Sequence, residues 1–257
     1  MPVSLTFSTG LLAGFLLVLV RVAAIFALVP LPGIRSAPES GRLVLSLAVT
    51  LALFPRWPAV PPEAVQPTAI VVWMAAEAAL GAAIGLAVAV IFEGFAMAAQ
   101  VLGLQAGYAY ASTIDPNTQA DSGVLLVFAQ TAAGLLFFAA GLDRELLRLV
   151  ARSLEVAPPG AWVFSLRSAE AMIRLAAGVF AIGLRLAFPV VALLVMVDLA
   201  LALTGRIHSQ LQLLSLAFPA KMLAALAVLS WSVALFPRLL RESSAHSFST
   251  LRHLLGL

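Results

Sequence analysis

The sequence is dominated by apolar runs long enough to cross a lipid bilayer. A spanning α-helix needs about 20 mostly apolar residues, because the hydrocarbon core is about 30 Å thick and a helix rises about 1.5 Å per residue. The candidate runs are Leu11–Leu31, Leu43–Phe54, Ala69–Phe92, Val124–Ala140, Ala171–Leu203 and Leu211–Phe236. The second is short and is closed by prolines. The pattern predicts an all-α polytopic membrane protein with about six hydrophobic helices arranged as bent hairpins.

The composition supports this prediction and excludes several other classes. Of 257 residues, 62% are hydrophobic and 11% are charged, whereas a soluble domain has about 25% charged residues. The chain has no cysteine, which excludes disulfides and thiolate metal sites. Its net charge of +3 comes without a basic stripe, so nucleic acid is not an expected partner.

The arginines outside the runs predict an orientation. If all six runs cross, one side receives eight arginines and the other receives three. The first group is Arg56, Arg144, Arg148, Arg152, Arg167, Arg238, Arg241 and Arg252, and the second is Arg35, Arg42 and Arg206. Positive residues concentrate on the cytoplasmic side. The count therefore places both termini in the cytoplasm.

Charged residues interrupt the apolar runs. They are Arg21, Glu77, Arg174, Arg185, Asp198 and Lys221. A charge at mid-membrane costs about 2.5–3.5 kcal/mol on insertion scales, so each needs a partner or a water-filled cavity. Two interpretations stay open: the charges pair inside the bundle and fix its packing, or they line a polar path or an interface with other membrane subunits.

The last two runs predict a kinked hairpin that turns at Gly205-Arg206. Pro189 and Pro219 each remove a backbone donor and clash with the carbonyl four residues earlier, so both are expected hinges. Asp198 and Lys221 lie on opposite arms. The long lysine side chain can reach the carboxylate, which predicts an ion pair across the hairpin.

Three further stretches lie outside the clear spans. Glu93–Ser122 carries no Lys or Arg and is too apolar for a solvated loop yet too broken for a clean span. Residues 143–157 predict an amphipathic helix, with Asp143 as its N-cap and arginines at i, i+4 spacing on one face. Residues 237–257 form a basic tail that is expected to lie on the surface as an amphipathic piece.

No set of residues predicts catalysis. The three histidines lie outside the hydrophobic runs, and the chain contains no H-E-x-x-H, G-x-S-x-G or phosphate-binding glycine loop. We therefore expect no enzyme activity, no cofactor and no metal.

An ordered set of residues resembles the FliR family, the flagellar export-gate membrane proteins that are called SctT in injectisomes. It begins with Arg21-Val22, Pro30, Gly33 and Arg35 and continues with Gly103-Leu-Gln-Ala-Gly107 and Asp115-Pro116. It then includes Gly141 with the arginine-bearing helix to Pro158, and ends with Asp198, Arg206 and Phe218-Pro219-Ala220-Lys221. The resemblance covers nearly the whole chain in the order of the family.

The resemblance implies a role in type III protein export. One copy of such a protein assembles with FliP-like and FliQ-like subunits into the channel through which unfolded flagellar subunits leave the cytoplasm. FlhB-like and FlhA-like proteins are further partners, and the location is the bacterial inner membrane within the flagellar basal body. Residues 1–170 would be FliP-like and 171–236 would form a FliQ-like hairpin.

The resemblance also assigns a role to the cation-free stretch. In the family this region supplies a loop that plugs the lumen, here expected at 94–122, with Gly103, Gln105, Gly107, Asp115 and Pro116 as its framework. Tyr108 and Tyr110 are the bulky side chains expected to seal it, because large groups in a constriction exclude water and ions. The alternative is that these tyrosines pack against neighbouring helices.

The sequence thus predicts a structural and gating subunit of a protein-export channel, in contact with membrane lipid and unfolded substrates. The alternative is a small-molecule or ion transporter that uses Glu77, Asp198 and Lys221 as a relay.

Overall fold

The computed structural model describes residues 9–30, 39–57, 66–107, 123–162, 164–207 and 213–255. The described residues fold into helices and contain no strand. The elements are α1 (Thr9–Leu28), α2 (Glu39–Ala52), the 3₁₀ turn η1 (Phe54–Arg56), α3 (Pro67–Ala106), α5 (Gly123–Ala139), α6 (Leu142–Val156), α7 (Leu166–Ile207), α8 (Leu213–Ser232), η4 (Val233–Leu235) and α9 (Phe236–Leu255). The predicted all-α class is confirmed.

Within the described ranges, four stretches of helix are long and apolar enough to cross a membrane. They are Thr9–Leu28, Pro67–Ala106, Leu166–Arg206 and Pro219–His253. A fifth span results only if α5 and α6 count as one broken span. The predicted run Leu43–Phe54 corresponds to α2, which has 14 residues and is too short to span. The count of six crossings, and the orientation derived from it, therefore lack support.

Helix α3 is much longer than the apolar run that predicted it. It has 40 residues, which at about 1.5 Å per residue is about 60 Å, roughly twice the hydrocarbon thickness. Residues 93–106, expected to begin an irregular segment, continue the helix instead. Burial explains this difference, because Phe95 and Leu102 are buried and their packing favours a continuous helix despite the nearby glycines.

The described residues form two compact units, to which α3, α7 and α9 each contribute segments. The first unit comprises Met1–Val90, Gly141–Ala176 and Ser244–Leu257. In it α1 and α3 approach until their backbones nearly touch. A Cβ at Gly81 would lie 2.2 Å from the carbonyl oxygen of Arg21, and one at Gly85 would lie 2.7 Å from that of Ile25. These two glycines, spaced four residues apart, permit the close contact.

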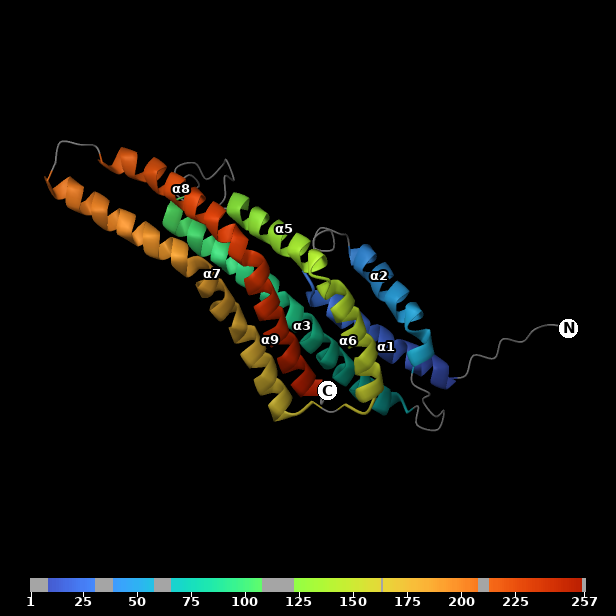
Figure 1. Cartoon of the computed structure of the whole chain (residues 1–257). Helices are drawn as coiled ribbons and strands as arrows, with labels where there is room; N and C mark the ends of the chain where they lie inside the picture. Colours follow the sequence, from blue (N-terminus) through green and yellow to red (C-terminus); the bar gives the residue numbers. More distant parts are fainter. Residues whose placement is uncertain are drawn as a thin grey trace. The chain divides into compact units, whose positions relative to one another are not determined.

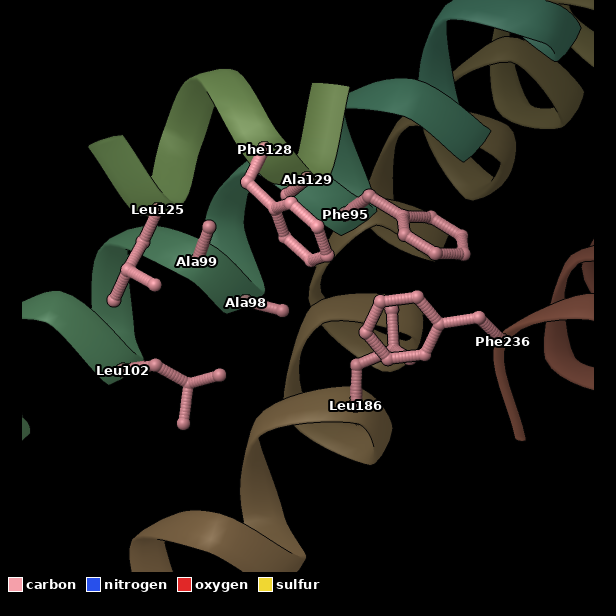
Figure 2. A pocket seen from close by; sticks show the side chains of 9 residues that line it. All are labelled: Phe95, Ala98, Ala99, Leu102, Leu125, Phe128, Ala129, Leu186 and Phe236. Atoms are coloured by element: carbon pink, nitrogen blue, oxygen red, sulfur yellow. The ribbon is translucent and has the colours of Figure 1, made fainter. Parts of the chain in front are cut away.

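The second unit comprises Ile91–Ala140 and Ala177–Ser243. Its core includes a small apolar cavity, and Figure 2 shows Phe95, Leu186 and Phe236 among the side chains around it. The rings of Phe95 and Phe236 meet edge to face with their centroids 5.5 Å apart. The cavity volume is about 20 Å³, roughly that of one water molecule. Its lining is apolar, so the cavity is a packing defect and not a binding site.

Two amphipathic helices complete the fold. Helix α6 begins one residue before the predicted helix 143–157, and it buries Leu146, Val150 and Leu154 as the periodicity indicated. Its N-cap is Gly141, in a left-handed conformation with φ of 70°, and not Asp143. The tail 237–257 lies mostly in α9, which buries one face and is not merely surface-lying.

Candidate functional site: two ion pairs within the apolar helices

The first charged centre lies in the core of the first unit. Arg21 on α1 and Glu77 on α3 form an ion pair, and both side chains are fully buried. Arg21 also donates to the carbonyl oxygens of Ser153, at 2.9 Å, and Ala157, at 2.7 Å. The second oxygen of Glu77 accepts a hydrogen bond from the backbone N–H of Gly160 at 3.2 Å. One buried pair thus joins α1 and α3 to the end of α6 and the turn after it.

The buried charges of this centre are both paired and hydrogen-bonded. A buried charge is costly unless it is both paired and hydrogen-bonded, and here each guanidinium nitrogen of Arg21 has an acceptor. Ser153 adds its hydroxyl, 3.1 Å from the same nitrogen that donates to its carbonyl. Such a closed arrangement fixes packing and leaves no position for a substrate.

The second centre lies in the second unit and is more open. Lys221 on α8 pairs with Asp198 on α7, with the lysine nitrogen 2.7 Å and 2.9 Å from the two carboxylate oxygens. The side chains are 16% and 43% exposed, respectively. Helices α7 and α8 lie side by side here (Figure 1). The ion pair predicted across the hairpin is therefore present.

A third residue completes this cluster. The side-chain amide of Gln105, one residue before the end of α3, donates to Asp198 at 3.3 Å. Gly107 follows with φ of 85°, and its N–H donates to the carbonyl oxygen of Leu104 as the helix ends. We call Gln105, Asp198 and Lys221 the hairpin cluster. It connects the hairpin arms to the end of α3.

The charges in the apolar runs are not all buried. Arg21 and Glu77 belong to the first unit and are buried, whereas Asp198 and Lys221 belong to the second and are partly exposed. Arg185 lies exposed on α7, and it forms no ion pair with any residue in the described ranges. The reason is helical geometry: Arg185 points away from the face of α7 that buries Leu186 and Val190.

The other residues predicted to form the plug are only partly described by the structure. Gly103 lies within α3 and is buried. Tyr108, Tyr110, Asp115 and Pro116 lie outside the described residues, so the plug stays a prediction.

The two expected hinges lie inside helices. Pro189 lies within α7 and Pro219 within α8, and neither ends its helix. Each proline leaves a carbonyl without its usual helical donor. Their role as hinges stays a prediction.

Sequence reasoning missed the acceptors of Arg21 and the second partner of Glu77. Gly160 has φ of 86° and packs against the indole of Trp73, where a Cβ would meet ring atoms at 3.1 Å. The available signal was Pro158-Pro159-Gly160, a combination typical of a tight turn. Nothing local to Ser153 marks its hydroxyl and carbonyl as arginine partners.

The charged side chains described above form ion pairs between helices. No group of three or more His, Asp or Glu residues in the described part of the chain could hold a metal ion. The geometry is that of ion pairs that join helices.

An all-helical chain with several span-length apolar helices, joined internally by ion pairs, is a polytopic membrane protein. The model of the family described as bacterial export proteins, family 1, matches residues 12–246. Because this match covers most of the chain, the protein belongs to that family.

Two proteins that are similar to the chain carry the same name. It is 29% identical over 239 residues to the flagellar biosynthetic protein FliR of Escherichia coli (strain K12), covering 93% of this chain and 89% of the relative. It is 26% identical over 257 residues to the flagellar biosynthetic protein FliR of Bacillus subtilis (strain 168), covering 96% of each. The resemblance to the FliR family is thereby confirmed.

Proposed function

We propose that this protein is a structural and gating subunit of the flagellar type III export channel, through which unfolded flagellar proteins leave the cytoplasm. The observation that carries the gating part of the proposal is the hairpin cluster. Of the predicted plug, 94–122, the described part ends at Gly107, and within it Gln105 donates a hydrogen bond to Asp198 of the Asp198–Lys221 pair. This bond supports the proposal that the base of the plug is attached to the hairpin, which would form the channel wall.

The proposal includes partners. Helix α7 is the longest in the described part of the chain. Only 22% of the residues in its membrane-length apolar stretch are buried. Large apolar side chains such as Phe180, Leu184 and Phe188 are exposed along it. A surface of this kind needs other membrane helices or lipid around it. We assign it to FliP-like and FliQ-like subunits in the bacterial inner membrane at the flagellar basal body, with FlhB-like and FlhA-like proteins as further neighbours.

The transporter alternative receives no support from the geometry. A relay requires carboxylates that can exchange protons or ions with a path, but Glu77 is buried and bonded on both oxygens. Asp198 is likewise engaged, in an ion pair with Lys221. We therefore propose no transport cycle and no catalytic step for this chain.

The test removes the two bulky side chains of the plug. We expect Tyr108→Ala with Tyr110→Ala to leave the complex assembled but leaky, because a constriction without large side chains admits water and ions. The measurement is membrane conductance in cells that make the gate while export is idle. The yield of FliP-like and FliQ-like subunits that co-purify with the chain is measured beside it.

The matched control is Tyr108→Phe with Tyr110→Phe, which retains both rings and should stay sealed. Normal conductance of the alanine variant, with intact assembly, would mean that the seal lies elsewhere. A chain that purifies as a monomer from cells expressing all three proteins would contradict the assignment as a gate subunit.

A further inference from the structure

A cavity of about 590 Å³ lies within the first unit, and none of its lining residues belongs to either ion-pair centre. It is bounded by the beginning of α7 and the last turns of α9. Its lining residues are Ser165, Arg167, Ser168, Glu170, Ala171, Arg174, Thr250 and His253.

The charges in the cavity favour an anion. Arg167 and Arg174 are permanent cations, and both line the cavity. Arg167 forms no ion pair with another residue of the described ranges. Glu170 is the one carboxylate in the lining, and its pair with Arg174 is 3.3 Å long with side chains 55% and 78% exposed. Exposed pairs of this kind are weak, so a phosphate can compete for Arg174.

A serine pair adds a neutral donor to the same wall. The hydroxyls of Ser165 and Ser168 lie 2.9 Å apart, so one donates to the other and the second O–H is left to donate to a ligand. The hydroxyl of Thr250 already donates to the carbonyl of His246 at 3.0 Å. Arginines with hydroxyls are the combination that binds phosphate oxygens.

The surroundings of the cavity are apolar and exposed. Phe164 is 52% exposed, Leu166 79% and Ile173 68%, and each lies within three residues of a lining residue. Trp162 contacts Phe164, with ring centroids 6.0 Å apart. Aromatic side chains concentrate at the boundary between headgroups and hydrocarbon.

The cavity also lies between two helical stretches that are long and apolar enough to span a membrane. The stretch of α7 is Leu166–Arg206, and the stretch that runs through α9 is Pro219–His253. Basic pockets between transmembrane helices bind anionic lipid headgroups.

From these observations we infer that the cavity binds the phosphate headgroup of an anionic phospholipid. Arg167 and Arg174 contact the phosphate, while Phe164, Leu166 and Ile173 contact the acyl chains. The apolar neighbours decide between the sources of phosphate, because a free phosphate ion or an acidic peptide would leave these three side chains exposed to water. The inference is independent of the export function.

The test uses the full chain purified in detergent and native mass spectrometry to count bound lipids. The three probes are dioleoyl phosphatidylglycerol, dioleoyl phosphatidylcholine and glycerol phosphate. We expect retention of phosphatidylglycerol only. Arg167→Gln with Arg174→Gln should weaken it about thirtyfold, since each of the two arginines contributes about 1 kcal/mol near an anionic surface and about 1.4 kcal/mol corresponds to a tenfold change.

The control is Arg144→Gln with Arg148→Gln, which removes the same charge from the exposed face of α6 and should leave lipid retention unchanged. If the double pocket variant does not fold, Arg167→Gln alone replaces it, and Arg167→Lys with Arg174→Lys should retain most of the binding. Equal retention of glycerol phosphate, or no difference between pocket and control variants, would overturn the inference. So would a pocket variant that binds lipid normally but loses a partner subunit, because an acidic protein segment would then be the ligand.

Discussion

Both ion pairs join a cationic side chain to a carboxylate, but they differ in how far they are buried. Arg21–Glu77 is fully buried, and its remaining hydrogen-bonding capacity is taken up by Ser153, Ala157 and Gly160. Asp198–Lys221 is partly exposed, and Gln105 is the additional partner of its carboxylate.

The difference in burial gives the two pairs different roles: the buried pair is fixed, whereas the partly exposed pair can open. Exchanging the partners of a buried, saturated pair requires uncompensated charge in the core, which costs several kcal/mol. A partly hydrated pair can open because water replaces the lost contacts. The first centre therefore fixes the packing of its unit, whereas the second can change when the hairpin or the end of α3 moves.

The largest expected effect comes from breaking the buried pair. Glu77→Ala leaves Arg21 buried without a counter-charge, which costs about 3–5 kcal/mol, a large part of a typical total stability of about 5–15 kcal/mol. We expect little or no intact protein in the membrane fraction, measured by immunoblot and by thermal unfolding of what remains.

Two further variants provide comparisons for the loss of stability in Glu77→Ala. Arg21→Met with Glu77→Met should recover part of the loss, because apolar side chains can replace a buried pair. Arg56→Ala breaks the exposed pair with Glu155 and should cost less than about 1 kcal/mol. If Glu77→Ala were as abundant as Arg56→Ala, the buried centre would not be the anchor of its unit.

The second prediction compares one glycine from each unit. A Cβ at Gly81 meets a backbone oxygen of α1 at 2.2 Å, whereas one at Gly183 meets the sulfur of Met97 at 2.9 Å. The backbone cannot move without displacing Arg21, but a methionine side chain can adjust. Gly81→Ala should therefore destabilise by about 1–3 kcal/mol, and Gly183→Ala should destabilise less, because Met97 has to shift but no backbone atom is among its nearest contacts. Equal shifts in the thermal midpoint would contradict this ranking.

The third prediction concerns the partly exposed pair. Asp198→Ala should cost about 1–2 kcal/mol, less than the buried case because water screens the lysine left behind. We expect a lower yield of assembled complex. Asp198→Ala with Lys221→Met should recover part of it. A double variant no better than either single variant would count against direct pairing as the cause.

The smallest effect on stability is expected at Gln105. Gln105→Leu removes one hydrogen bond of 3.3 Å, which contributes about 0.5–1.5 kcal/mol. Thermal unfolding should change little, but idle conductance should rise, because the base of the predicted plug loses its attachment to Asp198. Gln105→Asn is the comparison, since it keeps the amide but shortens its reach. Unchanged conductance in both variants would separate the hairpin cluster from gating.

The sequence by itself determined the class of the protein and several local features. Apolar runs predict membrane helices because the free energy of transfer into lipid sums along the chain. The helix 143–157 follows from apolar residues at helical spacing, and the Asp198–Lys221 pair follows from opposite charges on two consecutive apolar runs. Each of these signals lies within one segment or between neighbouring segments.

The tertiary structure alone decided which distant groups meet. Arg21 lies 56 residues from Glu77 and 132 from Ser153, and no periodicity connects them. The continuation of α3 through residues 93–106 and the exposure of Arg185 likewise depend on which face packs against a neighbour. The reason is physical: a charge in an apolar helix requires a partner, but only packing decides which partner comes within reach.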